Sequence, residues 1–139
     1  LYNCGKHINL SSYHKHSWYL IKNFELLGYS QVETNIIAAI ARYHRKSLPK
    51  KRHESWQILI SREDKATVLD MSLILRLAAS LDKRPDPVIA SLEISLLDDQ
   101  LNTKLIAMSS ENDLSLEKWG LNSCYESLKE LKNLELKVS

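Results

Sequence analysis

The stretch LDKRPDPVIASLEISLL, residues 81–97, joins two parts of the chain with different periodicity. Before it, apolar residues recur at helical spacing, and its two prolines stop that pattern because proline lacks a backbone donor and restricts its neighbours. After the prolines, apolar and polar residues alternate over 88–96, which is the period of a half-buried strand. The sequence therefore predicts an α+β protein, with an all-helical domain over residues 1–84 and a small sheet domain over residues 88–139.

Local signals predict the helices of the first domain. Ser30 and Glu33 have the spacing of a capping box, in which the two side chains satisfy free backbone amides at a helix start. Gly28 is a natural end for the preceding helix, and Pro49 disfavours helical geometry at Leu48. Helices are expected over residues 12–27, 30–46, 53–60 and 61–83. The buried stripe of the last helix is expected to contain Val68, Met71, Leu75, Ala78 and Leu81.

The second domain is predicted to be a ββαβ unit. Strands over 88–96 and 101–108 are separated by a short polar turn and should pair as a hairpin. A single helix is expected from Asn112 or Asp113 to about residue 132, and residues 134–138 alternate as a last strand.

The composition is that of an ordinary globular protein, because 44% of the 139 residues are hydrophobic. No apolar run approaches the roughly 20 residues that cross a bilayer, so no membrane partner is expected. Cys4 and Cys124 lie near opposite ends without further ligands at metal spacing, which predicts two free thiols in a cytoplasmic protein. The chain begins at Leu1 within a patterned stretch, and we expect it to be part of a longer protein.

Charge is distributed unevenly along the chain. Residues 1–85 hold 14 Lys and Arg against 7 Asp and Glu, a net charge of +7, whereas residues 86–139 hold 5 against 10, a net charge of −5. The segment RYHRKSLPKKRHE, residues 42–54, concentrates six Lys and Arg and two His within twelve residues. Such a run is either a solvated helix end, a nucleic-acid patch or a site for another polyanion. No aromatic stacking platform accompanies it, so nucleic acid is not favoured.

His14, Lys15 and His16 lie in the first predicted helix. Histidines two residues apart do not share a helical face, so they do not form the i,i+4 zinc pair. We expect one histidine to point inward with a hydrogen bond and the other to face solvent, with anion binding and metal ligation as open alternatives. Asp82 is expected to be partly buried and paired. A metal site at this position would need His and Asp partners from elsewhere in the chain. The cations around His44 disfavour its protonated form.

Four segments carry a resemblance to a known family: YHKHS (13–17), WYLIKNFELLGYS (18–30), IAAIARYHRKSLPKK (37–51) and LILRLAASLDKR (73–84). Together they resemble the C-terminal part of the exopolyphosphatase / guanosine pentaphosphate phosphohydrolase family, and RYHRK is the most specific piece. The resemblance is strong over residues 1–84 and weaker over residues 88–139, which correspond to the small α/β tail of the family.

The resemblance implies that catalysis lies outside this chain. In the family, an N-terminal actin-like module removes terminal phosphate from inorganic polyphosphate or guanosine pentaphosphate with magnesium. The present chain would be a helical domain related to HD-type metal phosphohydrolases, followed by its tail. Tyr2 and Asn3 occupy the position of the metal-binding His-Asp dyad, and Asp82 that of the later Asp. Because Tyr and Asn are poor replacements for these ligands, we expect neither a metal site nor a catalytic residue here.

In the family, this region is thought to line a channel for polyphosphate and to support a homodimer. Cations in a row would bind such a chain by counterion release, as they bind nucleic acid. The residues that match this role are Lys15, His16, Arg42, His44, Arg45, Lys46, Lys50, Lys51 and Arg52.

Three alternatives stay open at this point. The chain could be a stand-alone HD-type metal-dependent nucleotide phosphohydrolase, although Tyr2 and Asn3 argue against it. It could be a purely structural dimerisation domain whose basic run is only solvated. A nucleic-acid-binding module is the least favoured of the three.

Overall fold

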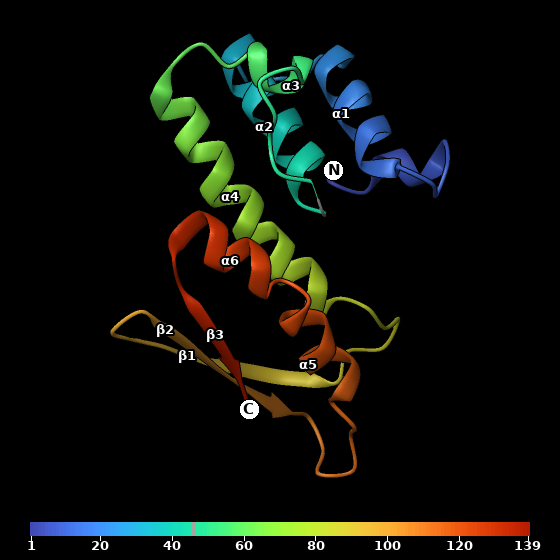
Figure 1. Cartoon of the computed structure of the whole chain (residues 1–139). Helices are drawn as coiled ribbons and strands as arrows, with labels where there is room; N and C mark the ends of the chain where they lie inside the picture. Colours follow the sequence, from blue (N-terminus) through green and yellow to red (C-terminus); the bar gives the residue numbers. More distant parts are fainter. Residues whose placement is uncertain (46) are drawn as a thin grey trace. The chain divides into compact units, whose positions relative to one another are not determined.

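A computed structural model describes residues 1–45 and 47–139 of the chain (Figure 1). The described residues form helices and a three-stranded sheet, which confirms the predicted α+β class. No helix of this described part is long and apolar enough to cross a bilayer.

The chain separates into two compact units, Leu1–Leu75 and Arg76–Ser139, called the N-terminal and C-terminal units below. The division falls within helix α4 (Arg62–Leu81). These units are defined by their internal contacts and are not themselves domain boundaries. The predicted domains, residues 1–84 and 88–139, therefore stay a prediction. Besides the first part of α4, the N-terminal unit contains η1 (Cys4–His7), α1 (Tyr13–Asn23), α2 (Gln31–Tyr43) and α3 (Glu54–Gln57).

Helix α2 begins as its sequence predicts. Ser30 Oγ accepts a hydrogen bond from the backbone N–H of Glu33 at 3.3 Å, and the Glu33 carboxylate accepts from the backbone N–H of Ser30 at 2.7 Å. Its buried face is lined by small residues such as Ala38 and Ala39, and its last residue, Tyr43, packs in a core cluster with Leu59. Helix α1 ends at Asn23, earlier than predicted, because Phe24 is extended, and Gly28 takes its positive φ of 86° in the following turn.

Helix α4 buries a different stripe from the one predicted. Val68 is buried as expected, but Met71 and Ala78 are exposed. Two serines take inward positions instead: the Ser72 hydroxyl donates to Leu69 O at 3.1 Å, and the Ser80 hydroxyl donates to Leu77 O at 2.7 Å. A hydroxyl that bonds its own helix can be buried without an unsatisfied polar group, so apolar spacing alone gave the wrong stripe.

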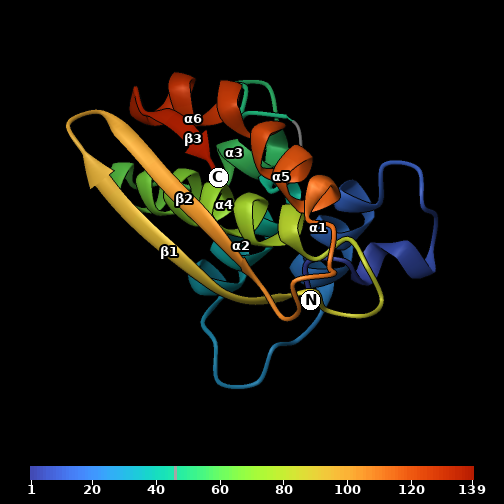
Figure 2. The same cartoon turned by 90° about the horizontal axis from the view of Figure 1, so that it is seen from below.

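The C-terminal unit contains β1 (Ile89–Leu97), β2 (Gln100–Ala107), α5 (Ser115–Asn122), α6 (Tyr125–Lys132) and β3 (Glu135–Val138). β1 and β2 pair antiparallel, which confirms the predicted hairpin, and β3 pairs parallel with β2. The single helix predicted before the last strand is instead two helices, so the order is ββααβ. Both helices pack against β3 (Figure 1). β1 lies at the edge of the sheet (Figure 2) and is exposed along most of its length, so the prediction of a half-buried strand was wrong.

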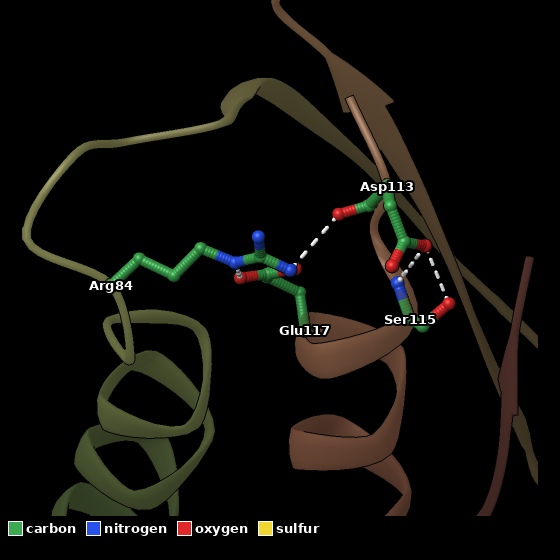
Figure 3. Close-up of polar contacts among 4 residues, drawn as sticks. All are labelled: Arg84, Asp113, Ser115 and Glu117. Carbon is green, nitrogen blue, oxygen red and sulfur yellow. Dashed lines mark hydrogen bonds and ion pairs between the residues drawn. The ribbon is translucent and has the colours of Figure 1, made fainter. Parts of the chain in front are cut away.

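The segment that carries Pro85 and Pro87 is held to α5 by Arg84 (Figure 3). Arg84 Nε donates to Glu117 Oε1 at 2.8 Å, and its Nη2 donates to Glu117 Oε2 at 3.3 Å and to Asp113 O at 3.0 Å. The Glu117 side chain is only 1% exposed. The charge on this buried carboxylate therefore depends on Arg84 for compensation, and the segment is an anchored loop.

We expect Arg84→Ala to destabilise the C-terminal unit by about 2 kcal/mol. Breaking a fully buried ion pair costs about 3–5 kcal/mol, and the cost is lower here because the Arg84 side chain is one-third exposed. Urea denaturation followed by circular dichroism measures the change. Lys83→Ala removes an exposed neighbouring cation and should change stability by less than about 0.5 kcal/mol. Equal effects of the two substitutions would contradict a structural role for the Arg84–Glu117 pair.

Candidate anion-binding site

An open cavity of about 470 Å³ lies in the N-terminal unit where α1, the end of α2 and the start of α3 meet. Its lining residues are Lys15, His16, Trp18, Tyr19, Arg42, Arg52, His53, Glu54 and Ser55. Three of these side chains are cationic, whereas Glu54 is the only carboxylate, and Glu54 already forms an ion pair with Lys22. We call this the basic cavity. Its charge suits an anion.

Arg42 is the most constrained cation of the basic cavity. Its guanidinium lies over the Tyr43 ring, 5.8 Å from the centroid, and burial lowers the pKa of Arg42. No carboxylate among the described residues forms an ion pair with it, and its buried Nη1 has no hydrogen-bond partner there. The indole Nε1 of Trp18, on the neighbouring helix, is also buried without a partner. A desolvated cation that lacks a counter-ion is costly, so an anion bound here would be stabilised.

His53 completes the cavity, and sequence reasoning did not select it. Its Nδ1 accepts a hydrogen bond from the backbone N–H of Lys50 at 3.2 Å and lies 3.1 Å from the Tyr43 hydroxyl. Nδ1 is therefore the acceptor, which leaves the proton of the neutral ring on Nε2. Burial, followed by the charge of Arg42, holds the pKa of His53 below its usual range. The signal for His53 was its place directly after Lys50, Lys51 and Arg52.

The structure places the predicted site residues in three groups. Lys15, His16, Arg42 and Arg52 line the basic cavity. Lys50 and Lys51 are exposed in the loop before α3 and are not among its lining residues, and Arg45 is exposed with its guanidinium 5.1 Å from the Tyr13 ring centroid. Lys46 lies outside the described residues.

His44 is placed away from the cavity surface. It is 2% exposed, its Nδ1 lies 2.8 Å from Ala41 O, and its Nε2 lies 3.1 Å from the Tyr13 hydroxyl. Nδ1 therefore donates to the Ala41 carbonyl, and Nε2 has the Tyr13 hydroxyl as its partner. With both nitrogens engaged and little surface exposed, His44 lies outside the lining of the basic cavity, and its predicted role in substrate binding stays a prediction.

Comparison with known proteins identifies the family. Residues 1–134 match the family model described as Ppx/GppA phosphatase, domain III. The chain is also 35% identical over 116 residues to a guanosine-5'-triphosphate,3'-diphosphate pyrophosphatase of Pseudoalteromonas translucida (strain TAC 125). The chain belongs to the Ppx/GppA phosphatase family. The aligned residues cover 81% of this chain and 21% of that relative, so the chain spans about a fifth of the relative's length.

Within this Ppx/GppA domain III, the positions compared above with a His-Asp dyad do not fit a metal. The Tyr2 ring packs edge-on against His44 with centroids 5.0 Å apart, and Asn3 is exposed. Asp82 belongs to the other unit and is exposed, so the expectation that it would be partly buried was wrong. Among the described residues, no group of three His, Cys, Asp or Glu side chains is arranged to hold a metal ion. Aromatic packing and an amide do not supply the anionic and imidazole ligands that such a site requires.

Proposed function

We propose that this Ppx/GppA domain III is an accessory domain of a cytoplasmic phosphatase and that it binds phosphate chains in the basic cavity. The ligand class is inorganic polyphosphate or the phosphates of guanosine pentaphosphate. The hydrolytic step, with its magnesium, belongs to the parent's catalytic module, and this chain also supports a homodimer. No residue of this chain is assigned a catalytic or metal-binding role.

The proposal rests mainly on Arg42. A half-buried guanidinium without a carboxylate partner is matched by a phosphate, because its planar fork of donors fits two phosphate oxygens. Lys15 and Arg52 add cations from α1 and from the loop before α3, and His53 adds an N–H donor. A merely solvated basic face would leave each cation free in water, whereas Arg42 is held desolvated by the fold.

We expect Arg42→Ala to weaken binding of long-chain polyphosphate at least about tenfold, since a hydrogen-bonded ion pair contributes about 1.5–3 kcal/mol. The measurement is a titration of the chain by calorimetry across a salt series. Arg62→Ala removes the same charge from an exposed position of α4 outside the cavity and should change affinity little. Removing Lys15, Arg42 and Arg52 together should also flatten the dependence of log K on log salt by about 2.

Guanosine pentaphosphate, polyphosphate and an RNA oligonucleotide of matched charge serve as the competing ligands. Tighter binding of RNA would favour the nucleic-acid alternative. Equal weakening by Arg42→Ala and Arg62→Ala would show that the basic cavity is only a solvated face. Circular dichroism of each variant confirms that a loss of affinity does not come from unfolding.

A further inference from the structure

The outer edge of β1 is exposed and apolar. The sheet order in the described residues is β1-β2-β3, so β1 has a paired strand on one side only (Figure 2). Leu92, Ile94 and Leu96 pair with Leu105, Thr103 and Leu101 of β2 and lie with them on one face of the sheet. Leu105 and Thr103 are buried, but Leu92, Ile94 and Leu96 are 40%, 62% and 58% exposed. The layer of helices therefore covers β2 and stops before β1.

From Ser91 to Leu97 this edge has few of the features that normally keep edge strands from pairing, because the register irregularity of β1 lies before this stretch, between Ile89 and Ser91. Natural edge strands are short, or carry lysine, proline or an inward-pointing charge. β1 spans nine residues, and its only charged residue is Glu93. Glu93 lies on the opposite face from Ile94, and its carboxylate accepts from Lys104 Nζ at 2.9 Å. The backbone edge and the apolar stripe are thus available to another strand.

The apolar stripe of β1, Leu92, Ile94 and Leu96, is symmetric about Ile94. In an antiparallel pair of two β1 strands centred there, Ile94 would face Ile94, Leu92 would face Leu96, and Glu93 would face Ser95. This register joins the two apolar stripes on one face. A centre at Glu93 would place two carboxylates opposite each other, and a centre at Ser95 would place Leu92 opposite Asp98. Of these three registers, the one centred on Ile94 avoids both mismatches.

We propose that β1 pairs antiparallel with β1 of a second copy of this chain about a two-fold axis at Ile94. The two three-stranded sheets become one continuous sheet, and the interface is isologous. The inference rests on the homodimer of the proposed function and names its surface. Backbone hydrogen bonds satisfy the edge, and the paired Leu92, Ile94 and Leu96 side chains remove each other from water.

Cross-linking at the axis tests the register directly. Ile94→Cys in a Cys4→Ser background places a cysteine opposite its own counterpart, with Cα atoms about 4.5–5.5 Å apart, within reach of a disulfide. Cys124 is buried and stays in place. Ser91→Cys is the matched control, because the same register separates the two copies of residue 91 by six residues, about 20 Å. Mild oxidation should produce a disulfide-linked dimer of the first variant and not of the second.

Sedimentation of the unmodified chain separates the possible failures. A dimer in solution without cross-linking of Ile94→Cys would overturn the β1 pairing and leave the homodimer in place through another surface. A monomer at all concentrations would overturn both, and phosphate binding would still be decided by its own titration. Equal cross-linking of Ile94→Cys and Ser91→Cys would show random collision and would also overturn the proposed register.

Discussion

Gly5→Ala is expected to destabilise the N-terminal unit by at least about 3 kcal/mol. A Cβ at this buried position would lie 2.1 Å from Tyr13 O and 2.4 Å from Ser17 N, and both atoms belong to the backbone of α1. Neither can move without bending the helix, so η1 would have to separate from α1. That separation would break the hydrogen bond from Gly5 N to Ser17 Oγ, which is 2.9 Å long. Overpacking of this kind costs about 1–3 kcal/mol, and the lost buried bond adds to it.

Gly28→Ala provides the control for this substitution. No atom lies within 4 Å of a Cβ placed there, but the φ of Gly28 is +86°, so alanine would carry only a conformational cost of about 1 kcal/mol. Urea denaturation followed by the fluorescence of Trp18 and Trp56 reports on this unit. If Gly5→Ala lowers the free energy of unfolding no more than Gly28→Ala does, η1 and α1 do not pack as closely as the distances from Gly5 indicate.

The elements that sequence predicted well are those with local signals. The capping box at Ser30 sets the start of α2 because both partners lie within one turn. The β1–β2 hairpin follows from alternation on both sides of the two-residue turn Asp98-Asp99, where Asp98 takes a φ of +52°. In both cases the information is contained in a few neighbouring residues, so no knowledge of tertiary contacts was needed.

The division into α5 and α6 depends on packing instead. The sequence between them has no proline, and Gly120 lies within α5 and not at the break. A Cβ on Gly120 would be 2.3 Å from Ser80 O, so this glycine allows α4 and α5 to approach within the C-terminal unit. Such a contact joins residues 40 positions apart in the chain, and periodicity within one helix does not show it.

The candidate site shows the same limit. Charge along residues 42–54 predicted an anion site in this region and included His44 in it, but the structure places His53 in the cavity lining and His44 outside it. His44 follows α2 directly and turns into the core beside Tyr13. His53 lines the cavity because the chain returns to α1 after Pro49. Which of the two histidines in this basic run lines the cavity depends on that return of the chain and could not be read from spacing.

His14 should make the N-terminal unit sensitive to mild acid. The side chain is 9% exposed, and its Nδ1 has no hydrogen-bond partner among the described residues. Burial, followed by the charges of Arg42 and Arg45, lowers the pKa of His14 to about 4. The expected inward histidine is therefore His14, and its Nδ1 makes no hydrogen bond among the described residues.

The direction of this pH effect follows from the pKa of His14 in the folded and in the unfolded chain. With a pKa of about 6.5 when unfolded and about 4 when folded, His14 binds a proton more readily in the unfolded chain. The free energy of unfolding should therefore decrease as the pH is lowered. The loss is about 2 kcal/mol between about pH 7.5 and 5, and it reaches about 3 kcal/mol near pH 4. Glu33 and Asp113, whose pKa values are lowered by hydrogen bonds from Ser30 and Ser115 respectively, lose their contributions at lower pH.

Urea denaturation of the chain and of His14→Gln at several pH values between about 7.5 and 5 measures this loss. The variant should lose the part of the pH dependence that comes from His14, whatever its stability at neutral pH, because glutamine does not titrate, whereas His53, whose pKa is also lowered, still contributes. His7→Gln, at an exposed position, should retain it. An unchanged slope in His14→Gln would mean that another group takes up the proton on unfolding. Since Arg42 both lowers the pKa of His14 and lines the basic cavity, a bound phosphate should reduce the same acid sensitivity by neutralising part of that charge.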